Sequence, residues 1–186
     1  ALPIYIAVAA GVANSLYSGI NNRTDLDPWH ETAMGSIAIT APKDSGFLAG
    51  STLYAGAVVG PDSGDQQNYY LGATLNTPVA GLKAGVAFDY VENPSLAGYT
   101  LGGNLWIVGA YACYQATEKL SLHARGECGQ ANTAPETTLG SLTGTLQYDL
   151  WKNVISRLEL RWDQFHQPGQ FTDTGVSLYA NFIYKF

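Results

Sequence analysis

Charged side chains alternate in sign along one short segment near the C-terminal end. Arg157, Glu159, Arg161 and Asp163 occupy every second position. In an extended strand, every second side chain lies on the same face. Such a row can line a solute path, where opposed charges create a transverse field. It can equally form an internal ladder of salt bridges that stabilises a sheet and conducts nothing, and the sequence leaves both alternatives open.

Other charges follow the same spacing in neighbouring segments, such as Arg125 and Glu127. In a membrane-spanning strand, Arg or Lys on the lipid side costs roughly 2 to 4 kcal/mol near the bilayer midplane. The strand charges, five acidic and five basic, are therefore predicted to line an interior. They are Lys83, Asp89, Arg125, Glu127, Asp149, Arg157, Glu159, Arg161, Asp163 and Lys185.

Three carboxylates lie close together in one loop segment. Asp25, Asp27 and Glu31 offer oxygen ligands to calcium, but they lack the spacing and the glycine of an EF-hand loop. The segment is therefore predicted to be a solvated acidic loop with no metal, and calcium remains the weaker alternative.

The remaining reactive side chains do not form a catalytic pattern. Ser121 and His123 share a strand face, yet no GxSxG or HExxH motif accompanies them. Cys113 and Cys128 are predicted to lie about four residues out of register on neighbouring strands, too far apart for a disulfide. We predict neither an enzyme nor a cofactor.

The composition indicates a β structure. Of 186 residues, 13% are charged, while 21 are Gly, 12 Tyr and 4 Trp. Glycine and aromatic residues suit a twisted sheet better than a helical bundle. The net charge of -6 and the lack of a basic stripe argue against a nucleic-acid partner.

Two charge-free stretches, residues 1–22 and 93–117, are long enough to cross a bilayer as helices. Proline, glycine, asparagine and serine interrupt both, which would leave polar groups facing lipid. A period of two explains the chain better, since ten segments are each long enough for a tilted membrane strand. These segments cover residues 3–16, 33–41, 46–59, 68–77, 82–91, 100–116, 120–129, 138–150, 154–165 and 174–186.

The predicted connections alternate in length. Short turns fall at residues 42–45, 78–81, 117–119 and 151–153, and long polar loops at 17–32, 60–67, 92–99, 130–137 and 166–173. Short periplasmic turns and long extracellular loops are typical of an up-and-down outer-membrane barrel. With ten strands, both termini would lie on the periplasmic side. The long loops hold eight acidic residues and one basic residue.

Aromatic residues concentrate near the strand ends, as in the interfacial girdles of membrane barrels. The predicted membrane-interface set is Trp106, Tyr114, Tyr148, Trp151, Trp162, Phe182, Tyr184 and Phe186.

Three segments carry a family resemblance: WIVGAYACYQATEKLSLHARGE (106–127), TLGSLTGTLQYDLWKNVISRLELRWDQF (138–165) and GVSLYANFIYKF (175–186). They combine a Trp and two Tyr in one strand, a Lys-containing turn, Arg-Gly-Glu, and Arg-x-Glu-x-Arg-x-Asp. The pattern resembles the C-terminal half of the β-barrel porin-2 family of Gram-negative outer membranes. The resemblance covers about the last hundred residues, and it implies a passive pore for small hydrophilic solutes with no cofactor.

We therefore expect an all-β, transmembrane, antiparallel barrel over residues 1–186, either one complete domain or the C-terminal part of a larger barrel. Ten closed strands leave at most a narrow lumen. Unpaired edges in lipid are prohibitive, because each unsatisfied backbone group costs several kcal/mol. Closure, or a partner that supplies further strands, is obligatory.

The leading expectation for function is porin-like passive diffusion of small hydrophilic solutes or ions in the outer membrane of a Gram-negative bacterium. Expected partners are outer-membrane lipids, those solutes, and a second copy or another envelope protein. The alternative is a non-conducting structural or assembly barrel that binds a partner or surface component through its acidic loops. A soluble barrel would need polar outward faces, which the C-terminal strands lack.

Overall fold

A computed structural model describes residues 4–13, 31–60, 66–96, 99–100 and 102–186. Ten strands form one antiparallel sheet in which each strand pairs with its neighbours along the chain. They are β1 (Tyr5–Ala13), β2 (Thr32–Thr40), β3 (Thr52–Gly60), β4 (Gln66–Asn76), β5 (Leu82–Glu92), β8 (Asn104–Gln115), β9 (Leu120–Asn132), β10 (Thr137–Trp151), β11 (Val154–Gln167) and β12 (Phe171–Tyr184). The all-β, up-and-down arrangement of ten strands predicted from the sequence is confirmed.

Strand boundaries differ from the prediction at three connections. The turn after β2 is longer than expected, because a 3-10 helix, η1 (Gly46–Leu48), occupies the start of the predicted third strand. The connections at 133–136 and 168–170 are shorter than the predicted loops, since β9 to β12 extend further. Polarity stops alternating at residues such as Gln130 and His166, but backbone pairing does not depend on that alternation.

Two further short strands, β6 (Ser95–Leu96) and β7 (Tyr99–Thr100), form a hairpin between β5 and β8. Both charge-free stretches contribute strands to the main sheet: β1 from the first, and β8 from the second. Among the described residues, no helix is long and apolar enough to cross a membrane.

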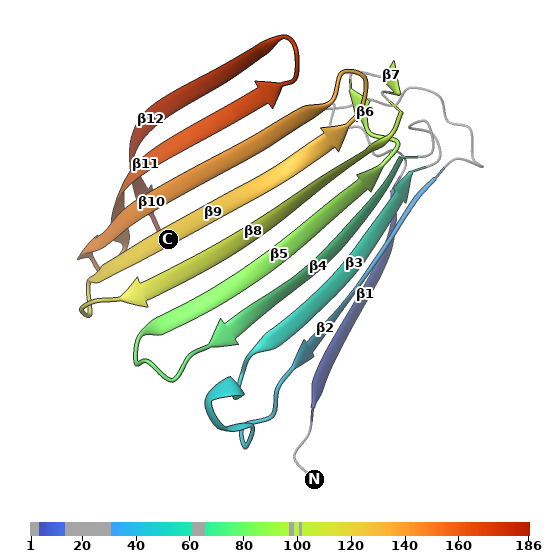
Figure 1. The fold of residues 1–186 in the computed structure, drawn as a ribbon. Coiled ribbons are helices and arrows are strands. Elements are labelled where there is room, and N and C mark those ends of the chain that lie inside the picture. Colours follow the sequence, from blue (N-terminus) through green and yellow to red (C-terminus); the bar gives the residue numbers. More distant parts are fainter. Residues whose placement is uncertain (1–3, 14–30, 61–65, 97–98, 101) are drawn as a thin grey trace.

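The sheet is open. Figure 1 shows a curved trough with β1 and β12 at its two margins. Within the described residues β1 pairs with β2 alone and β12 with β11 alone, so the predicted closed barrel is not formed. Alternating polarity identifies strands that can pair, but an edge strand and a central strand carry the same pattern, so the pattern cannot report closure.

β1 begins and β12 finishes at the end of the sheet that carries the short turns (Figure 1). We call it the turn end; it holds the connections 41–51, 77–81, 116–119 and 152–153. At the opposite end, here the loop end, β1, β3, β5, β9 and β11 finish and β2, β4, β8, β10 and β12 begin. The start of the first strand and the end of the last strand therefore lie on the side of the short turns, in agreement with the predicted strand order.

The sheet is one layer thick and has almost no core. Among the described residues, the buried hydrophobic side chains are Ala87 and Ile155. A soluble domain instead packs two layers around a hydrophobic core. The backbone ladder and cross-strand side-chain pairs must therefore provide most of the internal cohesion, and both faces remain available to their surroundings.

Gly129 provides a test of the register between β8 and β9. A Cβ atom built at this buried glycine would overlap the backbone oxygen of Trp106. A backbone oxygen inside a sheet cannot move aside, so Gly129→Ala is expected to lower the free energy of unfolding by about 1 to 3 kcal/mol. Urea unfolding followed by tryptophan fluorescence measures this. Gly175→Ala is the control, because nothing lies within 4 Å of its Cβ position; equal losses in the two variants would contradict the register.

Candidate pore-lining face

The pairing register assigns each strand residue to one of two faces, because directly paired residues lie on the same side of a sheet. One rung of paired residues runs from β5 to β12 as Gly85, Tyr111, Arg125, Thr143, Arg161 and Ser177. The next rung toward the loop end is Ala87, Gly109, Glu127, Ser141, Asp163 and Gly175. We call the side that holds these rungs the polar face and the opposite side the apolar face.

Nine of the ten charged residues predicted to line an interior lie on the polar face. They are Lys83, Asp89, Arg125, Glu127, Asp149, Arg157, Glu159, Arg161 and Asp163. The tenth, Lys185, follows the end of β12, and its backbone N–H donates to the Asn153 carbonyl at 2.8 Å. The nine come from four strands, so the sheet gathers charges that are far apart in the sequence.

Glu127 is the centre of the densest polar cluster on this face. Its carboxylate accepts a hydrogen bond from the Ser141 hydroxyl at 3.0 Å and lies 3.4 Å from the Arg125 Nε. The Tyr111 hydroxyl donates to its other oxygen at 3.4 Å. The Arg125 Nε lies within ion-pair distance but has no hydrogen-bond partner. Three strands are therefore joined through one carboxylate.

On β11 the alternating charges are only partly paired with one another. Arg161 donates from Nε to both Asp163 oxygens at 2.9 and 2.8 Å. Glu159 instead accepts from the Thr145 hydroxyl at 2.8 Å, and Arg157 donates to the Gln147 side-chain oxygen at 2.8 Å. Within the described part of the chain, the two ion pairs are Arg125–Glu127 and Arg161–Asp163. The salt-bridge ladder considered from the sequence is therefore incomplete.

Two tyrosines on the polar face lie over glycines, a feature that the sequence reading missed. Cβ atoms built at Gly72 and Gly109 would meet the rings of Tyr70 and Tyr111 within 3 Å. Each ring covers a glycine two positions away on its own strand, which shields the bare backbone as aromatic side chains do for other strand glycines. Tyrosine and glycine two residues apart in a predicted strand is the signal that could have revealed it.

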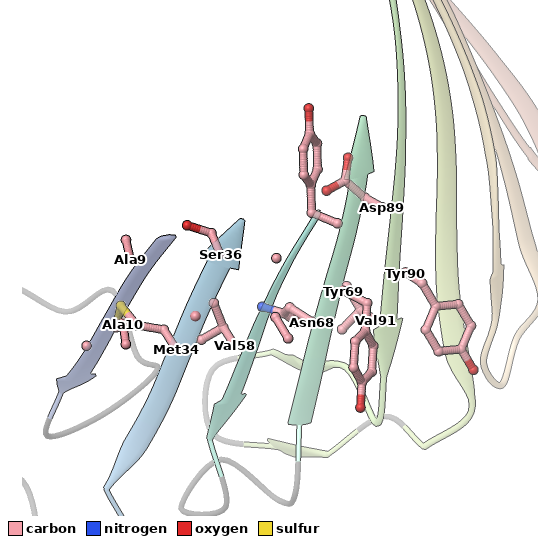
Figure 2. A pocket seen from close by; sticks show the side chains of 15 residues that line it. Ala9, Ala10, Met34, Ser36, Val58, Asn68, Tyr69, Asp89, Tyr90 and Val91 are labelled. Carbon is pink, nitrogen blue, oxygen red and sulfur yellow. The ribbon is translucent and has the colours of Figure 1, made fainter. Parts of the chain in front are cut away.

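The polar face has a charged side and a side of small residues. A pocket of about 560 Å³ lies along β1 to β5. Among the residues that line it, Asp89 and Ser36 point to one side of the sheet, and Tyr69 and Tyr90 point to the other (Figure 2). Small residues such as Ala9 leave this part of the face open. A second hollow of about 590 Å³ extends over β4 to β12 and is lined by long charged side chains that include Lys83 and Arg157.

The apolar face consists of exposed aliphatic and aromatic side chains. Val8, Leu178 and Phe182 are 73%, 68% and 75% exposed, and Leu142 and Leu160 are more than half exposed. Soluble monomers rarely expose a continuous apolar patch beyond a few hundred Å². A face this apolar over ten strands requires an apolar environment.

Most residues of the predicted membrane-interface set lie on the apolar face near a strand end. Trp106 lies near the loop end together with Tyr69 and Tyr90, whose ring centroids are 6.3 Å apart. The residues on this face near the turn end are Tyr114, Tyr148, Trp151, Phe182 and Tyr184. Trp162 lies mid-strand, level with Leu142, and Phe186 follows β12.

Glu31, Ser121 and His123 are the described residues of the calcium and hydrolase alternatives. Asp25 and Asp27 lie outside the described residues, and Glu31 is exposed beside the start of β2. No group of three His, Cys, Asp or Glu that could hold a metal occurs among the described residues. Ser121 and His123 are hydrogen-bonded at 3.1 Å, but within the same set no carboxylate bonds the imidazole to orient it.

Both cysteines are free, and they lie on opposite faces. Cys113 pairs with His123 in the register and shares the polar face, whereas Cys128 pairs with Val108 on the apolar face. The absence of a disulfide between them is as predicted. The register shows that their opposite orientation, as well as their separation along the strands, prevents pairing.

Comparison with known proteins extends the family resemblance to nearly the whole chain. The profile of a family described as putative beta-barrel porin-2, OmpL-like, matches residues 7–186. The match includes the N-terminal strands, which the motifs of the last hundred residues did not cover. The comparison with curated proteins finds no match. The chain belongs to this putative β-barrel porin family, which is not a family of enzymes.

Proposed function

We propose that the chain forms the wall of an outer-membrane β-barrel through which small hydrophilic solutes or ions diffuse passively. The observation that carries the proposal is the separation of charge: the nine charged strand residues of the predicted set share the polar face, and the apolar face is exposed. Lipid on one side and water on the other is the environment that such a sheet requires. Family membership supports an outer-membrane location.

The open edges define what else the proposal needs. Each unpaired backbone group in lipid costs several kcal/mol, so β1 and β12 must be paired in the membrane. Ten strands closed alone would have a narrow lumen, whereas 16 to 18 leave an aqueous channel. The proposed pore therefore includes further strands at these two edges, from a second copy or from other polypeptide.

A non-conducting barrel is the second candidate function. Ser141 donates a hydrogen bond to Glu127, and Arg125 lies within ion-pair distance of the same carboxylate, an arrangement that also suits a filled interior. In that case the acidic loop end would serve to bind a partner or surface component. The two functions differ in one property, namely whether water and solutes reach the polar face.

The native cysteines provide a direct test of solvent access. In lipid vesicles, a charged, membrane-impermeant thiosulfonate is expected to modify Cys113 on the polar face and to leave Cys128, on the apolar face, unmodified. Mass spectrometry of the Cys113→Ser and Cys128→Ser variants measures the extent of modification of each remaining thiol separately. Modification of Cys113 should also reduce single-channel current in a planar bilayer.

The controls separate the outcomes. Both thiols should react after denaturation, which shows that the reagent is competent. A folded, heat-modifiable protein that is silent in the bilayer and protects Cys113 would favour the non-conducting barrel. Reaction at Cys128 with protection of Cys113 would contradict the assignment of the two faces.

A further inference from the structure

Charge on this sheet is sorted along the strand axis. The reference level is the rung that contains Arg125 and Arg161. Among the described residues, every charged residue on the loop-end side of that rung is acidic. These residues are Glu31, Asp89, Glu92, Glu127, Glu136, Asp163 and Asp173.

The bases lie on that rung or on its turn-end side. Those described are Lys43, Lys83, Lys119, Arg125, Lys152, Arg157, Arg161 and Lys185. The acidic residues on the turn-end side are fewer, namely Asp44, Glu118, Asp149 and Glu159. The turn end therefore carries a net positive charge, and the loop end a negative one.

The ion pairs of the polar face follow the same order of charge along the strand axis. In Arg125–Glu127 and in Arg161–Asp163, the carboxylate is the partner nearer the loop end. Asp89 and Asp173 share one rung further toward the loop end, and that rung contains no base. At the other end, the side chains of Lys83 and Arg157 are exposed on the same face.

Fixed charges on a pore wall set the local concentration of mobile ions. Carboxylates at one mouth collect cations, and ammonium and guanidinium groups at the other collect anions. A voltage that makes the loop side positive drives both kinds of ion from their enriched mouth toward the middle, which raises conductance. The opposite voltage draws both out of the middle and lowers it.

We propose that the wall acts as a charge-sorted path that admits cationic solutes preferentially at the loop end and conducts better when the loop side is positive. This inference rests on the proposed pore function and specifies its solute preference. It does not depend on which strands close the barrel, provided that they do not reverse the charge order.

The test uses purified protein in planar bilayers. The orientation of the protein is determined with Thr133→Cys in a background of Cys113→Ser and Cys128→Ser. The thiol at position 133 is labelled with biotin. If streptavidin added to one compartment blocks the current, the loop end faces that compartment. In 0.1 M KCl, where the screening length is about 10 Å, we expect currents about twofold larger with the loop side positive. In 1 M KCl, where it is about 3 Å, the ratio should approach one.

Matched variants locate the effect. Asp89→Asn combined with Asp173→Asn removes the two carboxylates of the base-free rung and should reduce the asymmetry. The control, Asp44→Asn combined with Glu118→Gln, removes two carboxylates at the turn end and should preserve or increase it. An equal loss in both variants would show that total charge, not its position along the axis, sets the current.

The outcomes also separate this inference from the pore function. Equal currents at both polarities in 0.1 M KCl, or larger currents with the loop side negative, would overturn the charge-sorted path while leaving a pore. A folded, heat-modifiable protein without any conductance would overturn the pore function, and the inference with it.

Discussion

Replacing Leu178 by lysine is expected to lower the free energy of unfolding in lipid vesicles by about 2 to 4 kcal/mol, the cost of a cation near the midplane on the lipid side of a barrel. Leu178 lies in the middle of β12 on the apolar face and is 68% exposed. Its side chain has little packing to lose within the chain, so the loss would come from the environment. Urea titration followed by tryptophan fluorescence measures it.

The neighbouring residue provides the control. Tyr179 is 51% exposed, lies on the polar face and pairs with Glu159 in the register. A lysine at this position would be in water and opposite a carboxylate, so Tyr179→Lys should change the unfolding free energy by less than about 1 kcal/mol. Equal losses at positions 178 and 179 would contradict the separation into a lipid face and a water face.

Glu127→Ala is expected to destabilise the polar face. The substitution removes the acceptor of the Ser141 and Tyr111 hydrogen bonds and the ion-pair partner of Arg125. A fully buried cluster would lose about 3 to 5 kcal/mol, but the Glu127 and Arg125 side chains are 20% and 35% exposed, so we expect about 1 to 3 kcal/mol. Urea unfolding in lipid again gives the value.

Two further variants identify the source of that loss. Glu127→Gln keeps an acceptor for the Ser141 hydroxyl and should recover part of the stability. Asp163→Ala breaks an ion pair that lies within β11 and in which Asp163 is 29% exposed. Because this pair links no neighbouring strand, its cost should be smaller. A loss at Asp163 as large as that at Glu127 would show that the link across three strands adds nothing to the pairwise contacts.

The four C-terminal strands could be read from the sequence because their polarity alternates cleanly. In β11, Leu158 and Leu160 oppose Arg157 and Glu159, so one face excludes charge and the other requires it. The number of strands, their order and the end at which the termini lie follow from repeated alternation and from the positions of the turns. These features depend on short-range patterns.

The faces of β1, β3 and β8 could not be read, because small and apolar residues occupy both sides. Only the register with their neighbours fixes the faces, as the opposite orientations of Cys113 and Cys128 show. The Glu127 cluster could not be predicted from the sequence either, since Tyr111 and Ser141 become neighbours of Glu127 through the pairings on either side of β9. Closure depends on a contact between the first and last strands, on which local patterning has no bearing.

The strictly sequential pairing of this sheet affects how such a protein can change in size. Because every strand of the main sheet pairs with its neighbours in the chain, the topology consists of a series of hairpins and contains no crossover. Inserting or duplicating one hairpin leaves all other pairings, the direction of each strand and the end at which both termini lie unchanged. Recombination can therefore alter the circumference of the assembled wall in steps of two strands. Each added hairpin pairs strands that are close in the sequence, so its contact order stays low.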